Sequence, residues 1–173
     1  MKRLYFVLAF FCLISLFASA DSTTQQQIAM LKQLFPTLHT ITVICNVNDV
    51  QPVLHELKAA AASSGIELSV FDVKSFPEVY KIFRSLPPKV DLIWMVQDTV
   101  ASGDKQGRRF LEENCLRKKI PLVAYSEETL HEGALLFVSI QNGQPAALIN
   151  KNVAGLIEFH VPAGLESRVT VID

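Results

Sequence analysis

The chain has 173 residues, half of them hydrophobic, and its 16 lysines and arginines nearly balance its 17 aspartates and glutamates. The resulting formal net charge of −1 at pH 7 excludes the strongly basic surface of a nucleic-acid-binding protein, so we expect no nucleic acid as a partner. This length is sufficient for one domain with a hydrophobic core of its own.

The first 20 residues have the pattern of a secretory signal peptide. Lys2 and Arg3 supply a positive start, an apolar run follows over residues 4–17, and residues 18–20 (ASA) match a small-residue cleavage site. The apolar run is shorter than the ~20 residues of a membrane-spanning helix, which disfavours a permanent anchor. We therefore expect cleavage after Ala20, leaving an exported, soluble periplasmic protein with no integral membrane segment.

Short apolar runs rich in β-branched residues alternate with segments whose apolar residues recur at helical spacing. The first pattern is typical of strands buried on both faces of a sheet, and the second of helices that cover those faces. Proline and glycine, such as Pro36 and Gly65, mark the ends of elements. In chain order, we predict a helix at residues 24–34, a strand at 41–45, a helix at 50–63, a strand at 66–73, a helix from Pro77 to residue 86, a strand at 92–96, a helix at 104–117, a strand at 121–125 and a short helix at 127–132.

Asn142 and Gly143 lie between two further apolar runs, residues 135–140 and 146–149. Both residue types tolerate positive φ, so this pattern predicts a β-hairpin, which a last helical piece at residues 153–158 follows. Strands that alternate with helices favour a mostly parallel sheet with helices on both faces. We therefore predict an α/β fold, a three-layer α/β/α sandwich with a flavodoxin-like, mostly parallel sheet to which the hairpin adds an antiparallel edge.

Sheets of this kind bind ligands at the carboxyl ends of their strands, where the strand order switches direction. That rule points to the loops at residues 46–49, 97–102 and 126–128. Three stretches that contain or flank these loops carry a family resemblance: residues 31–46 (LKQLFPTLHTITVICN), 91–102 (DLIWMVQDTVAS) and 120–134 (IPLVAYSEETLHEGA). The tail, residues 149–173 (INKNVAGLIEFHVPAGLESRVTVID), also resembles the ending of the same family. Together they resemble the C-terminal lobe of the ABC-transporter substrate-binding proteins of the tryptophan/uncharacterised-solute type.

The resemblance implies a periplasmic-binding-protein-like lobe that binds a solute and catalyses no reaction. In that family, the loops facing the cleft carry an Asn-rich, a D-T-V-like and a Ser-Glu-Glu-like sequence. The matching residues, which are the ligand-binding candidates here, are Asn46, Asn48, Asp98, Thr99, Ser126 and Glu127. A cleft rich in carboxylates and amides suits a small amine- or amino-acid-like ligand, because buried polar groups need hydrogen-bonding partners.

We find no counterpart of the family's N-terminal lobe, and we expect residues 21–173 to form a single lobe. The six candidates are then expected around an open, shallow surface, which a second copy in a homodimer or an envelope protein partner would close. The alternative function is that of a protein-interaction or accessory domain in an envelope transport or signalling system, without a small-molecule ligand of its own.

Catalytic interpretations of the same residues lack necessary parts. A phosphoreceiver role for Asp98 would need two acids for a Mg²⁺ pocket, and the loop after the first strand offers only Asp49. A nucleophilic role for Cys45 or Ser126 would need a motif such as G-x-S-x-G with a histidine partner, and the four histidines are scattered. The sequence also has no C-x-x-C and no Cys/His cluster. We therefore expect no enzymatic activity, no metal and no cofactor.

Several other residues have simple structural interpretations. Cys45 and Cys115 are expected to be free, buried thiols that behave as small hydrophobic residues. Trp94 lies in a predicted central strand and is expected in the core. Glu112 and Glu113 are adjacent on a predicted helix, where neighbouring side chains point apart, so both are expected on solvated faces.

Overall fold

The computed structural model describes residues 23–173, and the predicted signal peptide lies outside the described residues. Within this range, no helix is both long enough and apolar enough to cross a membrane. The elements in chain order are α2 (Thr23–Leu34), β1 (Thr40–Cys45), α3 (Val47–Ser63), β2 (Glu67–Asp72), α4 (Phe76–Ser85), β3 (Leu92–Trp94), α5 (Lys105–Lys118), β4 (Leu122–Val123), α6 (Glu127–Glu132), β5 (Leu136–Gln141), β6 (Gln144–Asn150), α7 (Lys151–Ile157), the 3-10 turn η2 (Glu166–Arg168) and β7 (Val169–Ile172).

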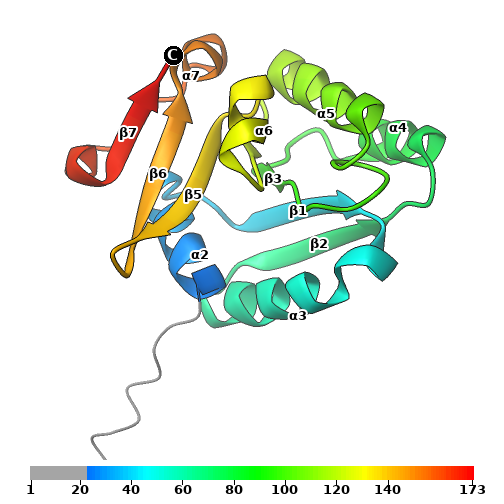
Figure 1. The fold of residues 1–173 in the computed structure, drawn as a ribbon, viewed down its shortest axis with the longest axis horizontal. Coiled ribbons are helices and arrows are strands. Elements are labelled where there is room, and N and C mark those ends of the chain that lie inside the picture. Colours follow the sequence, from blue (N-terminus) through cyan, green and yellow to red (C-terminus); the bar gives the residue numbers. More distant parts are fainter. Residues whose placement is uncertain (1–22) are drawn as a thin grey trace, which may run out of the picture.

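A seven-stranded sheet in the order β2-β1-β3-β4-β5-β6-β7 organises the domain (Figure 1). The first five strands in this order are parallel, and β6 is antiparallel to β5. Because the chain moves from β1 outward to β2 and then back across β1 to β3, the strand order reverses between β1 and β3. The predicted flavodoxin-like α/β sandwich is confirmed, and its switch point lies at the carboxyl ends of these two strands.

Two hydrophobic clusters cover the two faces of the sheet. Alternation along β3 divides its residues between them, so that Leu92 and Trp94 pack with α2 and α3, whereas Ile93 packs with α4 and α5. Figure 1 shows α3 along one side of β1 and β2, and α4 and α5 on the opposite side. The central strands are therefore apolar on both faces, which is the pattern that the sequence displays.

The hairpin forms as predicted, with Asn142 and Gly143 at φ values of 51° and 75°. The prediction that it provides the edge of the sheet is wrong, because Val169–Ile172 adds β7 as a parallel neighbour of β6. β7 has only four residues and none of them is fully buried. Such a strand has too weak an apolar pattern to be recognised before its pairing partner is known.

The helix predicted from residue 50 begins earlier, at Val47, and Asn46 caps it with its side chain. The predicted loop at residues 46–49 is therefore mostly the first turn of α3. Val50 departs from helical geometry, with φ −127° and ψ 20°, and Pro52 follows inside the helix. Proline removes a backbone donor and crowds the preceding turn, which explains why the chain kinks here and why the sequence suggested a later start.

Candidate functional site

The loops after β1 and β3 meet at the switch point of the sheet. The backbone N–H of Asn46 donates to Oδ2 of Asp98 at 2.7 Å, which ties the end of β1 to the loop after β3. Thr99 then donates its backbone N–H to Oδ2 of Asp49 at 3.0 Å and its hydroxyl to the same oxygen at 2.5 Å. Residues separated by about 50 positions in the chain thus form one polar cluster at this edge.

Asp98 organises the loop after β3 from inside. It is 4% exposed, and besides Asn46 its carboxylate accepts backbone N–H groups of Val100, Ala101 and Ser102. Gly103 completes the turn, since a Cβ there would lie 1.8 Å from the carbonyl oxygen of Asp98. The expectation that Asp98 lies on an open surface is therefore wrong, because its own loop wraps around the carboxylate and supplies its donors.

Asp49 carries the exposed negative charge of the cluster. The hydroxyl and the backbone N–H of Thr99 donate to its carboxylate and hold the pKa of Asp49 below its ordinary value. Asp49 therefore stays ionised at neutral pH. The sequence placed Asp49 in one of the three candidate loops, but the family pattern selected its neighbours Asn46 and Asn48 as ligand-binding residues.

Lys74 adds a positive charge next to this cluster. Its ammonium donates to Oδ1 of Asn46 and to Oδ1 of Asp72, each at 2.7 Å. The ion pair lowers the pKa of Asp72, whose carboxylate also accepts the backbone N–H of Val47 at the start of α3. The side chain of Asn46 is thus committed to the helix cap and to Lys74, whereas Asn48 is exposed.

Ser126 and Glu127 follow the next strand, β4. The hydroxyl of Ser126 caps α6 by accepting the backbone N–H of Thr129 at 3.2 Å, and Glu127 is exposed in the first turn. Among the hydrogen bonds of residues 23–173, none joins this pair to the other four candidates. The structure therefore brings Asn46, Asp98 and Thr99 into one bonded cluster, with Asn48 at its surface, and sets Ser126 and Glu127 on a neighbouring loop.

Two cavities adjoin the cluster. A polar one of about 550 Å³ is lined by Asp49, Gln97, Asp98, Thr99, Gly103 and Asp104. A more apolar one of about 230 Å³ lies between α2, α3, the ends of β3 and β4 and the start of β5, with Trp94, Tyr125 and Phe137 among its lining residues. Gln97 lines both cavities.

Gln97 and Tyr125 did not emerge as candidates from the sequence. Each lies at the end of a predicted strand, next to a polar loop. This position at a strand end is the signal that could have identified them. Trp94 is buried in the core as expected, with 8% exposure, and it also contributes to the wall of the apolar cavity.

The cysteines and histidines do not form a catalytic arrangement at this edge. Burial raises the pKa of Cys45 to about 12 and also raises that of Cys115, so both remain thiols at neutral pH. The two residues belong to different core clusters and are free. All four histidines are exposed. In the described part of the chain, no group of three or more His, Cys, Asp or Glu residues is placed to hold a metal ion.

Residues 18–157 match the family described as ABC transporter substrate binding protein. This match includes both loops of the polar cluster, the loop after β4, and most of the sheet. No curated protein matches the chain.

Solved structures with the same fold come from bacteria and are distant in sequence. A conserved domain protein from Vibrio cholerae has a TM-score of 0.73 at 16% identity, and an ABC domain in complex with L-Trp from Streptococcus pneumoniae has 0.73 at 20% identity. For both, the alignment covers 87% of this chain and 60% of the other. A ligand-free, open substrate-binding protein with adhesive properties from Clostridium difficile has 0.68 at 16% identity, with 85% and 58% covered. The chain thus spans about three fifths of the length of these structures.

Proposed function

Because the chain belongs to the ABC transporter substrate-binding protein family, we propose that it binds a small solute at the carboxyl ends of β1, β3 and β4. The observation that carries this proposal is the position of Gln97, which lines both the apolar cavity and the polar one beside Asp49. A cavity that is mostly apolar with a few convergent polar groups is typical of small-molecule sites. The role is binding rather than catalysis.

The apolar cavity would receive the hydrophobic part of the solute. Trp94, Val53 and Leu57 are among its lining residues, and the aromatic ring of Trp94 provides a large contact area for apolar or aromatic groups. Its volume of about 230 Å³ is smaller than that of most complete ligand pockets, so it suits a portion of a ligand whose remainder lies outside. The L-Trp bound to the pneumococcal relative supports a solute of amino-acid type.

The exposed polar residues at the strand ends would bind the polar part of the solute. Asp49 is ionised at neutral pH and stands at the rim, where a ligand ammonium could pair with it. Asn48, Gln97 and Glu127 are exposed and offer further hydrogen-bonding groups. Asn46, Asp98 and Ser126 act indirectly in this proposal, since their side chains cap helices or organise loops.

One face of a single domain leaves the other side of a bound solute in water, whereas good sites bury most of a small ligand. We propose that residues 21–173 form one lobe and that a second surface closes over the strand ends. A second copy of this chain or an envelope protein partner could provide it. Sedimentation velocity with and without ligand distinguishes these cases, because only the homodimer forms from the purified chain alone.

Thermal-shift and calorimetric screening of the purified protein against amino acids and biogenic amines tests the proposed function. Ligand binding raises the apparent stability by mass action, so an amino acid with an apolar side chain should raise Tm in a saturable way. Asp49→Asn should weaken that binding. If no amino acid binds, or if amino acids bind equally well to Asp49→Asn, the strand-end assignment is wrong.

We also propose export, on the basis of residues 1–20. Intact-mass analysis of the protein recovered from the exported fraction of a bacterial host should give a chain that begins at Asp21. A membrane-bound product that retains the first 20 residues would contradict both cleavage and release.

A further inference from the structure

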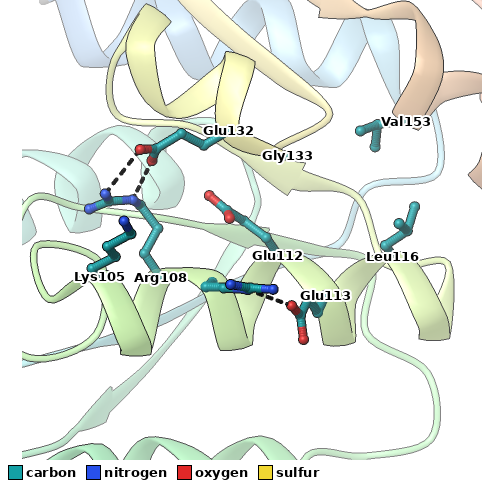
Figure 2. A pocket seen from close by; sticks show the side chains of 9 residues that line it. Lys105, Arg108, Glu112, Glu113, Leu116, Glu132, Gly133 and Val153 are labelled. Carbon is teal, nitrogen blue, oxygen red and sulfur yellow. Dashed lines mark hydrogen bonds and ion pairs between the residues drawn. The ribbon is translucent and has the colours of Figure 1, made fainter.

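A separate cavity of about 440 Å³ lies along α5, beneath the end of α6 and the start of α7 (Figure 2). It is lined by Lys105, Arg108, Arg109, Glu112, Glu113, Leu116, Glu132, Gly133 and Val153. It shares no lining residue with the two cavities at the strand ends. Its volume falls in the range of small-molecule pockets.

Glu112 is the unusual residue of this cavity. Its side chain points from α5 toward Gly133 (Figure 2), and the residue is only 8% exposed. Among residues 23–173, Oε1 of Glu112 has no hydrogen-bonding partner. The expectation that Glu112 lies on a solvated face is therefore wrong, because the end of α6 covers it. A buried polar atom without a partner is costly, and native structures contain few of them.

The arginines nearest to Glu112 are engaged with other acids. The guanidinium of Arg108 pairs with both carboxylate oxygens of Glu132, at 2.5 Å and 3.2 Å. Arg109 pairs through Nε with Glu113 at 2.7 Å. Each arginine thus pairs with a different carboxylate. Lys105 is the third cation of the cavity wall, and within residues 23–173 no ion pair joins it or either arginine to Glu112.

The cavity combines this carboxylate with an apolar end. Leu116 lies one helical turn beyond Glu112 on α5, and Val153 faces it from α7 (Figure 2). Gly133 packs against Glu112, since a Cβ at that position would lie 3.4 Å from the Cβ of Glu112, within ordinary van der Waals contact.

We propose that this cavity is a second binding site, which takes a small organic cation of the alkylammonium or alkylguanidinium class. The positive group pairs with Glu112, and the alkyl stem lies against Leu116 and Val153. A cationic donor at this place satisfies the orphan oxygen and neutralises the charge, whereas an anion or an uncharged apolar ligand does neither. The site is independent of solute binding at the strand ends.

Protonation of Glu112 controls this site. Burial raises its pKa to about 7; the nearby carboxylates Glu132 and Glu113 act in the same direction, and Arg108 and Arg109 oppose it. Val153 is the only residue that α7 contributes to the cavity wall, so no charge faces Glu112 from that helix. The carboxylate that pairs with a cation is therefore present at pH 8 and largely absent at pH 5.5.

Calorimetric titration of the purified protein at low salt tests the proposal, with n-butylamine and agmatine as cationic probes and butyrate as an anion of matched size. At pH 8, both cations should bind in a saturable way, and butyrate should not. Affinity should fall at least about tenfold at pH 5.5, since the proton and the cation compete for one carboxylate. This pH comparison uses the unmodified protein and does not depend on how any variant folds.

Two substitutions locate the binding. Glu112→Gln preserves the side-chain volume and should weaken cation binding at least about tenfold at pH 8. Glu128→Gln removes an exposed carboxylate on α6 that lines none of the three cavities, and it should leave the affinity unchanged. The proposal is overturned if neither cation binds at pH 8, if butyrate binds equally well, or if Glu112→Gln retains the affinity. A loss confined to Asp49→Asn would instead assign the amine to the strand-end site.

Discussion

Thr99 donates both its backbone N–H and its hydroxyl to the same carboxylate oxygen of Asp49. The two residues are 50 positions apart in the chain and belong to the segments that follow β3 and β1. This contact joins the two loops at the switch point and fixes the orientation of the exposed carboxylate. A preorganised carboxylate loses less freedom when a ligand cation binds, which favours affinity.

Thr99→Val removes the hydroxyl of this pair and keeps the side-chain shape. We expect the pKa of Asp49 to rise toward its ordinary value, because the largest of the contacts that lower it is lost while the backbone contact remains. A lowered pKa stabilises the folded state above the unfolded pKa, and this contribution disappears as the pH falls through the folded pKa. NMR titration of the Asp49 carboxyl carbon measures the shift, with Thr37→Val as an exposed control. An unchanged pKa of Asp49 in Thr99→Val would contradict the assigned role of the hydroxyl.

Asp98→Ala should destabilise the protein by about 2–4 kcal/mol, because it leaves several backbone N–H groups of a buried loop without their acceptor. Urea unfolding measures the free energy of unfolding. Asp173→Ala is the matched control: it removes an exposed carboxylate paired with Lys151, and such pairs typically contribute less than about 1 kcal/mol. A similar, small effect of both substitutions would show that Asp98 does not hold the loop together.

The sheet was predictable from the sequence where strands are apolar on both faces. The runs at residues 41–45 and 92–96 have the pattern of central strands, and Asn142-Gly143 predicted its hairpin because both residue types tolerate the positive φ that the turn requires. The strand Val169–Ile172 escaped prediction because it is short and partly exposed, so its pairing with β6 is visible only in three dimensions.

The site was predictable to the level of loops but not of individual side chains. Asp98 and Glu112 were both expected to be exposed acids, and both are buried. The loop of Asp98 folds around its carboxylate, and Asn46, 52 residues away, adds a further donor. Glu112 is covered by Gly133, the residue that ends the next helix. Hydrophobic periodicity does not contain these contacts, so it cannot separate a structural acid from a ligand-binding one.

Glu112 should make the stability of the protein depend on pH in an unusual direction for an acid. Its folded-state pKa of about 7 lies above the ordinary 4.5, so the folded protein holds the proton more tightly than the unfolded chain does. This stabilisation is complete below pH 4.5 and is lost as the pH rises through 7. We expect a loss on the order of 1–2 kcal/mol between pH 5 and pH 8, after allowance for solvent at the cavity mouth.

Urea unfolding across this pH range, without added amines, measures the effect. Glu112→Gln should remove most of the slope, since the amide does not titrate, whereas Glu128→Gln, at an exposed acid outside the cavity, should retain it. Equal slopes in all three proteins would mean that Glu112 titrates like an ordinary exposed carboxyl.

Two glycines provide a matched test of the hairpin. Gly143→Ala forces an alanine into φ 75°, with nothing within 4 Å of the new Cβ, so the expected cost of about 1 kcal/mol is purely conformational. Gly155 lies inside α7 and also has open space, so Gly155→Ala should stabilise the protein by roughly 0.5–1 kcal/mol. Thermal unfolding shows whether each substitution lowers or raises the stability of the protein. A neutral or stabilising Gly143→Ala would contradict the turn geometry.

Trp94 is the only tryptophan in the chain and lines the apolar cavity, so its fluorescence reports directly on the proposed solute site. L-phenylalanine, which combines an ammonium with an apolar ring, serves as the probe under selective excitation of tryptophan. We expect a saturable change in Trp94 emission, with affinity at least about tenfold lower in Asp49→Asn and unchanged in Glu67→Gln, a carboxylate at the opposite end of the strands. The absence of any saturable change in the unmodified protein, or equal affinities in all three, would contradict solute binding at the strand ends.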